Sequence, residues 1–150
     1  MRALVLDEVG IHLGQVDDPA LKPGEALIKV RMAGVCRTDL ELAKGYLNFR
    51  GVPGHEFDGE VAQMAPPVNS AADLIGKRVI GEINCGGGCE LCRAAGNQRN
   101  HRAGMALRLL QQRLIPTEQL ITAVYPAQEL EAAFGHAQKH EALKVPVNFR

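Results

Sequence analysis

The sequence predicts a mainly β domain with some α-helix, and three observations lead to this fold class. Short runs rich in β-forming residues alternate with turn signals over residues 1–83. Residues 26–32 alternate apolar and basic side chains with a period of two, which is typical of a strand buried on one face. After residue 104 the apolar residues take helical spacing. We therefore expect a barrel-like β module followed by a mixed segment.

The first part of the chain divides into strands and turns. Strands are predicted at residues 2–6, 11–16, 26–32, 57–63 and 77–83. Gly10 separates the first two strands as a hairpin, and Pro23 and Gly24 mark the next turn because they suit its backbone angles. The third strand leads to Cys36, after which a short helix is expected at 39–47.

Residues 84–104 differ in composition from the parts on either side. They contain many glycines, polar residues and three of the four cysteines, so they cannot build a core and need something other than packing to hold them. The final part, 105–150, is predicted to form a helix, a strand, a helix and a strand. Their expected ranges are 105–114, which Pro116 terminates, then 119–124, 126–139 and 143–149.

Composition limits the possible functions. The chain has 150 residues, which is enough for one domain with a real core. The chain has 17 Lys and Arg residues and 17 Asp and Glu residues, so its formal net charge is zero. A neutral chain has no positive field to attract nucleic acid or an anionic membrane, and neither is an expected partner. No signal peptide or membrane span is recognisable, which predicts a cytoplasmic protein whose cysteines stay reduced.

Two groups of residues have the chemistry of zinc ligands. A thiolate and an imidazole suit zinc, and Cys36 and His55 could supply them. Considered singly, each is better explained without a metal, Cys36 as a buried thiol and His55 as a loop histidine with satisfied hydrogen bonds. The second group is the spacing C-x3-C-x2-C formed by Cys85, Cys89 and Cys92, and three cysteines so close together favour a metal.

Two motifs around the first group resemble a known family. The run G-V-C-R-T-D at 34–39, followed by G-H-E-F-D-G-E-V at 54–61, is similar to the zinc-dependent alcohol dehydrogenases of the medium-chain dehydrogenase/reductase superfamily. The Cys-rich run at 85–92 resembles the structural-zinc lobe of that family, and residues 105–149 resemble its C-terminal return segment. The resemblance implies a GroES-like β-barrel catalytic domain over 1–83, a Cys-rich lobe at 84–104 and a return segment at 105–150.

The resemblance also implies roles for individual residues. Cys36 and His55 become ligands of a catalytic zinc, Thr38 passes a proton between substrate and solvent, and Asp39 orients the imidazole. Arg37 occupies a position where some relatives contact the pyrophosphate of the cofactor.

The third zinc ligand of the family generally lies on a segment that this sequence lacks. Glu56, next to His55, or a residue of a neighbouring chain could replace it.

The predicted structural lobe departs from the family pattern of C-x2-C-x2-C-x7-C. A fourth cysteine is missing, and His101 is the expected replacement, because imidazole completes Cys3His zinc sites. The alternative is a lobe that has lost its metal.

The expected function is that of a zinc-binding, alcohol dehydrogenase-like catalytic domain acting on a small alcohol or carbonyl compound. No G-x-G-x-x-G occurs, and no alternation of strands and helices separates the Cys-rich run from residue 105, so the Rossmann domain that binds NAD(P) is expected to be missing. Independent dehydrogenase activity and tight NAD(P) binding are therefore not expected. A dimer or higher oligomer is expected through the face that the missing Rossmann domain would leave bare, because exposed apolar patches favour a partner. The alternatives are a non-catalytic zinc-binding and oligomerising module, and hydrolytic chemistry by a zinc-bound hydroxide.

Overall fold

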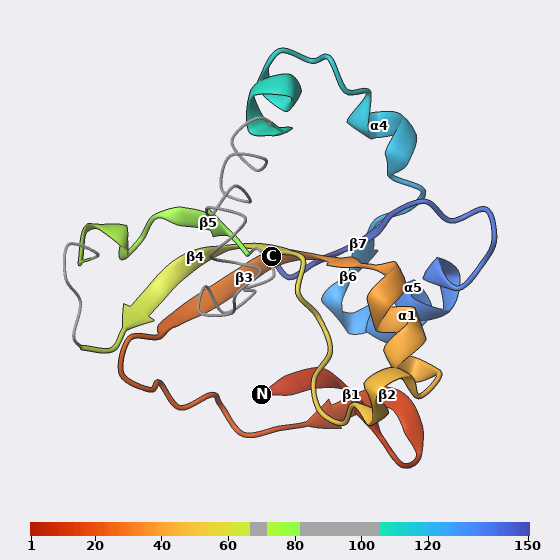
Figure 1. Cartoon of the computed structure of the whole chain (residues 1–150), viewed down its shortest axis with the longest axis horizontal. Coiled ribbons are helices and arrows are strands. Elements are labelled where there is room, and N and C mark those ends of the chain that lie inside the picture. Colours follow the sequence, from red (N-terminus) through yellow and green to blue (C-terminus); the bar gives the residue numbers. More distant parts are fainter. Residues whose placement is uncertain (67–71, 82–105) are drawn as a thin grey trace, which may run out of the picture.

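The computed structural model describes residues 1–66, 72–81 and 106–150. In chain order the strands are β1 (Arg2–Asp7), β2 (Gly10–Gln15), β3 (Ala26–Val35), β4 (Phe57–Met64), β5 (Arg78–Ile80), β6 (Tyr125–Pro126) and β7 (Val145–Asn148). The helices are α1 (Arg37–Ala43), α4 (Thr117–Leu120) and α5 (Leu130–Ala137), with 3-10 turns η1 (Tyr46–Asn48), η2 (Ala72–Leu74) and η3 (Ala127–Glu129). Residues 106–111 are also helical. The predicted fold class, mainly strands with some helices, is confirmed (Figure 1).

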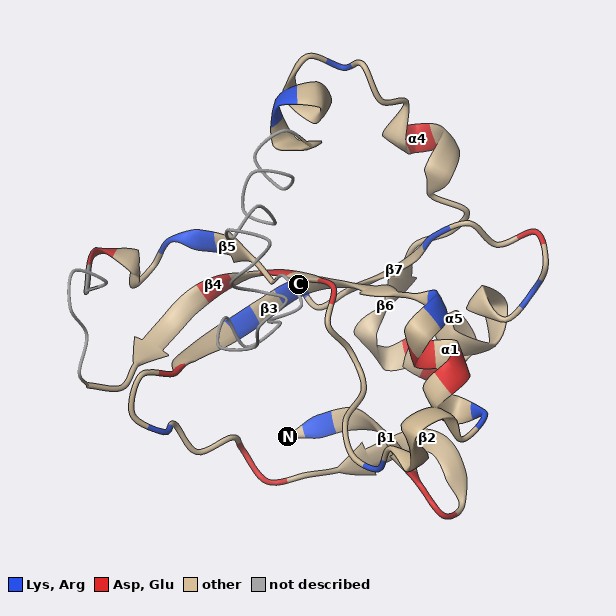
Figure 2. Cartoon of the chain, in the orientation of Figure 1, with Lys and Arg blue, Asp and Glu red and all other residues tan. Residues whose placement is uncertain are grey.

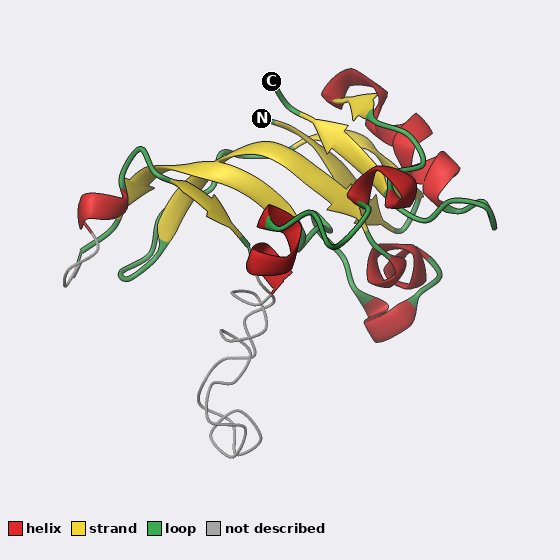
Figure 3. Ribbon diagram, turned by 90° about the horizontal axis from the view of Figure 1, so that it is seen from above, coloured by secondary structure: helices red, strands yellow, loops and turns green. Residues whose placement is uncertain are grey.

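The long strand β3 is the centre of a five-stranded sheet with the order β5-β4-β3-β7-β6. It pairs antiparallel with β4 on one side and with β7 on the other, and β6 joins β7 in parallel. Two shifts of register interrupt the β3–β4 pairing, and such bulges increase the twist of a strand pair. In Figure 3 the strands accordingly form a strongly curved surface, with α1 and α5 near one end of it. The sheet thus joins the first and the last parts of the chain.

The N-terminal hairpin forms as predicted. β1 and β2 pair antiparallel from Arg2↔Gln15 to Asp7↔Gly10, and Gly10 has a φ of +111°, a value that glycine adopts without steric cost. The Asp7 side chain accepts a hydrogen bond from Val9 N at 2.9 Å and so supports the turn. This hairpin is a separate two-stranded sheet beside α1 and α5 (Figure 1).

The core is shared between the two ends of the chain. Leu4 of β1, Leu40 of α1 and Phe134 of α5 form one buried cluster. A second cluster joins Ala133 of α5 to Val145 and Val147 of β7, both of which are 1% exposed. Because these contacts link segments more than 90 residues apart, the C-terminal segment is part of the same folded unit as the hairpin and α1.

Several predicted elements have different bounds, and one is wrong. The strand predicted at 119–124 is absent, since Thr117–Leu120 forms the helix α4 and only Ile121 makes a bridge, to Lys144. Pro116 stands before that helix and Glu118 lies in its first turn, and both residue types favour a helix start over a strand.

The other differences concern length. The helix predicted at 39–47 is shifted to Arg37–Ala43, and that predicted at 126–139 is a 3-10 turn followed by α5. The strands expected at 77–83 and 143–149 are shorter in the described residues. None of the described helices has the length and apolar character needed to span a membrane. In Figure 2, acidic and basic residues are interspersed along the described chain rather than gathered by sign.

Candidate metal centre

Cys36 lies at the junction between the central strand and the first helix. It follows β3 directly, has an extended backbone (φ −112°, ψ 165°) and is the N-cap of α1. Its Sγ accepts a hydrogen bond from Thr38 N at 3.2 Å, and its own N donates to Asp39 Oδ2 at 2.9 Å. These two bonds satisfy backbone donors at the helix start, so the thiol is held in a fixed position.

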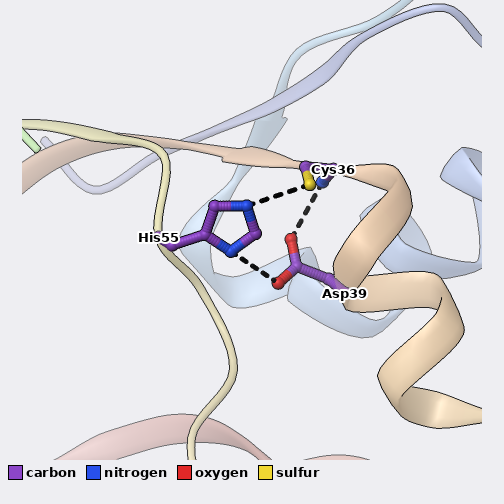
Figure 4. Close-up of side chains that lie close together, drawn as sticks. All are labelled: Cys36, Asp39 and His55. Carbon is purple, nitrogen blue, oxygen red and sulfur yellow. Dashed lines mark hydrogen bonds and ion pairs between the residues drawn. The ribbon is translucent and has the colours of Figure 1, made fainter. Parts of the chain in front are cut away.

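His55 reaches the thiol from the segment that leads into β4. Gly54 before it has a φ of +127°, and Glu56 O after it accepts a hydrogen bond from Gly34 N at 2.8 Å. This backbone path places His55 Nε2 3.0 Å from Cys36 Sγ (Figure 4). The side chain of His55 is 21% exposed, so the imidazole is partly accessible to solvent.

Asp39 completes the group from the first turn of α1. It is 4% exposed, and its Oδ1 lies 3.5 Å from His55 Nδ1. That distance is long for a hydrogen bond, and Oδ1 has no hydrogen-bond partner in the described residues. A buried carboxylate oxygen without a partner is costly, and an imidazole that binds a metal through Nε2 would turn its Nδ1–H toward this oxygen.

The three side chains therefore have the donor set that suits zinc. Within the part of the chain that is described, they are the one set of three or more His, Cys, Asp or Glu side chains whose ligand atoms lie within 4.8 Å of one another. Sγ and Nε2 adjoin each other, while the carboxylate faces the other ring nitrogen. This arrangement fits two direct ligands, Cys36 and His55, with Asp39 fixing the orientation of the ring.

Arg37 and Thr38 lie beside this group on the exposed side of α1. Together with Glu41 and Tyr46 they line an open depression of about 310 Å³. The Arg37 side chain is 81% exposed and its Nε lies 3.4 Å from Glu41 Oε1. The roles expected for Arg37 and Thr38 remain predictions.

The role of Glu56 as a third ligand remains a prediction. Its carboxylate forms an ion pair with the ammonium of Lys144, and it does not belong to the group of three potential ligands. Lys144 had no predicted role, because it lies 88 residues away in the sequence and belongs to no recognisable motif.

A family model decides what kind of domain carries this site. The model of the alcohol dehydrogenase GroES-like domain matches residues 22–124, which include both motifs around Cys36 and His55. The chain belongs to this family. The resemblance of the sequence to the zinc-dependent alcohol dehydrogenases is thereby confirmed.

Individual relatives of this alcohol dehydrogenase GroES-like domain support the assignment. L-threonine 3-dehydrogenase of Sinorhizobium medicae (strain WSM419) is 38% identical over 104 residues, which are 63% of this chain and 29% of that protein. Cinnamyl alcohol dehydrogenase 2 of Oryza sativa subsp. japonica is 39% identical over 77 residues, which are 48% of this chain and 21% of that protein.

Among solved structures, alcohol dehydrogenase TADH from Thermus sp. ATN1 matches with a TM-score of 0.51 and 34% identity, over 63% of this chain and 28% of that one. All three matches span less than a third of the relative.

The second predicted metal site of the GroES-like domain, formed by Cys85, Cys89, Cys92 and His101, lies outside the described residues.

An ion pair joins two neighbouring strands of the sheet. Arg78 of β5 donates to both carboxylate oxygens of Asp58 on β4, at 3.2 and 2.7 Å. These hydrogen bonds hold the pKa of Asp58 below its ordinary value of 3.8. Desolvation raises this pKa and so offsets part of the effect, while the positive charges of Arg78, Arg31 and Arg150 lower it further.

Proposed function

We propose that this chain is a zinc-binding catalytic domain of the alcohol dehydrogenase type, in which Cys36 and His55 bind the metal and Asp39 orients the imidazole. The observation that carries the proposal is the 3.0 Å approach of Cys36 Sγ to His55 Nε2, with the unpartnered oxygen of Asp39 facing the other ring nitrogen. A core histidine satisfied by its neighbours would not leave a buried carboxylate oxygen without a hydrogen bond.

The residues around the metal divide the chemistry between them. When bound, zinc supplies Lewis acidity, which lowers the pKa of an alcohol or a water molecule. Thr38 follows Cys36 by two residues and helps to line the open depression, and its hydroxyl is the group proposed to pass a proton between substrate and solvent. Asp39 keeps the imidazole in one tautomer, with the proton on Nδ1. The proposed substrate is a small-molecule alcohol or carbonyl compound.

The second part of the proposal concerns the cofactor. No G-x-G-x-x-G occurs within these 150 residues, so this chain alone is proposed not to bind NAD(P) tightly, nor to act as an autonomous dehydrogenase. Arg37, exposed beside the site, is the residue proposed to contact a cofactor pyrophosphate where a nucleotide-binding domain is supplied. Cys85, Cys89, Cys92 and His101 are proposed to bind a second, structural zinc.

Self-association is proposed through the apolar residues of segment 106–124. Leu107, Leu110, Leu114 and Leu120 are between 39% and 65% exposed there. Apolar side chains gathered on an exposed segment favour a partner. Sedimentation velocity at tens of micromolar checks this part, since a strictly monomeric species would contradict it.

Cobalt substitution tests the metal site directly. Cobalt bound by a thiolate gives a sulfur-to-metal charge-transfer band in the near ultraviolet, and Cys36→Ser is expected to remove the part of that band due to this site. Calorimetry with NADH and NADPH tests the cofactor proposal separately, because a saturable heat of binding in the micromolar range would overturn it. The two experiments can fail independently of each other.

A further inference from the structure

Glu41 on α1 is shared by two basic side chains. Its Oε1 lies 3.4 Å from Arg37 Nε, one helical turn before it, and 3.0 Å from Lys44 Nζ at the end of the helix. The same carboxylate oxygen therefore faces both cations, and acidic and basic residues adjoin each other along α1 in Figure 2. All three side chains are exposed to solvent, and Glu41 is the least exposed of them. They form one surface cluster beside the metal centre, with two positive charges and one negative.

The open depression at this place is rich in hydrogen-bond donors. Arg37 and Glu41 line it together with the hydroxyl-bearing side chains of Thr38 and Tyr46, so Glu41 is the one acid among the lining residues. A guanidinium and an ammonium can only donate hydrogen bonds, and a hydroxyl can donate as well. An excess of donors around a single carboxylate suits an anion with several oxygens. The carboxylate of Glu41, which accepts a hydrogen bond from Lys44, thus lies where an external anion would meet the two cations.

We infer that Glu41 is an internal competitor that limits how tightly Arg37 and Lys44 bind a phosphate-type anion, the diphosphate of a dinucleotide. The inference rests on the proposed contact of Arg37 with a cofactor pyrophosphate, and it adds Lys44 as a second cation and Glu41 as the group that restrains both. While Glu41 pairs with the two cations, an arriving anion has to replace its carboxylate before the oxygens of the anion can meet them. Glu41 is thus a positioning residue that keeps both basic side chains at the depression and weakens the binding of the anion.

Titration with inorganic pyrophosphate at low ionic strength tests this inference, followed by nuclear magnetic resonance of the backbone amides of residues 37–46. Each variant is made in the native chain and in a Cys36→Ser chain, because pyrophosphate also binds zinc and serine can replace Cys36 as the N-cap of α1. Glu41→Gln keeps the size of the side chain and is expected to tighten pyrophosphate binding by about three- to tenfold, since two exposed ion pairs no longer compete. Glu118→Gln on the exposed helix α4 changes the net charge equally and is the control, expected to alter the affinity by less than about twofold.

Glu41→Asp separates competition for the cations from simple repulsion of the anion. Aspartate keeps the negative charge, but its side chain is shorter and pairs less well with the two cations. Competition therefore predicts a gain in affinity of about twofold or more for Glu41→Asp, whereas repulsion predicts no gain. Lys44→Gln, added to Glu41→Gln, should weaken pyrophosphate binding by about threefold or more, because the second cation is lost. Inorganic phosphate, the other source of this chemistry, is titrated in parallel and should bind more weakly than a diphosphate that meets both cations.

Three results would overturn the inference. The first is a gain for Glu41→Gln no larger than that for the control, and the second is a gain for Glu41→Gln without one for Glu41→Asp. In these two cases the proposed contact of Arg37 would stand. The third is a gain with phosphate that is absent with pyrophosphate. If pyrophosphate moved no amide resonance of residues 37–46 in any chain, the proposed contact of Arg37 would be refuted together with the inference, while the zinc content of the wild type tests the metal site separately.

Discussion

Truncation of Phe134 to alanine is expected to destabilise the whole domain. Phe134 is 2% exposed and packs against Leu4 of β1 and Leu40 of α1, so it joins three segments that are distant in sequence. The lost burial of the ring costs about 1.5–3 kcal/mol. A cavity of roughly 100 Å³ adds about 2 kcal/mol at about 24 cal/mol per Å³. The expected loss is therefore about 3–5 kcal/mol, a large part of the 5–15 kcal/mol typical of a domain.

Urea unfolding followed by far-ultraviolet circular dichroism measures this loss. Val9→Ala is the matched control, because Val9 is 89% exposed and its truncation should change the free energy of unfolding by less than about 0.5 kcal/mol. If Phe134→Ala cost no more than the control, the C-terminal helix would not be packed on the hairpin and α1. The description of the chain as one folded unit would then be wrong.

Three further predictions concern the sheet and the metal centre. Gly59→Ala should lower the free energy of unfolding by about 1–3 kcal/mol, because the added Cβ would lie 2.7 Å from a backbone carbonyl oxygen of the neighbouring strand. Gly135→Ala is the control in the same urea assay. Its added Cβ would meet no atom within 4 Å, so this change should be neutral or stabilising. The pKa of Asp58 is lowered in the folded state, so this carboxylate stabilises the fold above its ordinary pKa, and the stabilisation is lost as the pH falls through the folded value. Arg78→Gln should return the pKa of Asp58 toward 3.8 in a carbon-13 NMR titration. An unchanged pKa would contradict the role given to Arg78. Asp39→Asn should weaken zinc binding by about 10–100-fold in a chelator competition while the circular dichroism spectrum is kept, and unaltered affinity would exclude its orienting role.

Local patterns in the sequence predicted local parts of the fold well. The hairpin around Gly10 and the strand leading to Cys36 depend on turn chemistry and on a period of two, which are properties of neighbouring residues. The strand predicted at 119–124 failed because a short apolar run does not distinguish a strand from a helix. The order of strands, including the parallel pair β6–β7, depends on contacts between distant segments and was not predictable in this way.

In the candidate site, too, residues in local motifs were predictable and contacts between distant segments were not. The motifs around Cys36 and His55 identified two side chains that the structure brings to 3.0 Å from each other. The cap formed by Asp39 at the start of α1 was not recognised, since cysteine is not among the usual N-cap residues. Lys144 could not be found from the sequence, because an ion pair across 88 residues leaves no local pattern.

The central claim is that Cys36 and His55 hold a zinc ion, and counting zinc in the purified chain tests it most directly. The metal content of the wild type, Cys36→Ser and His55→Asn is measured by mass spectrometry after dialysis against a weak chelator, with folding checked by circular dichroism. Each variant is expected to contain one zinc per chain fewer than the wild type. An equal zinc content in all three proteins would contradict the account.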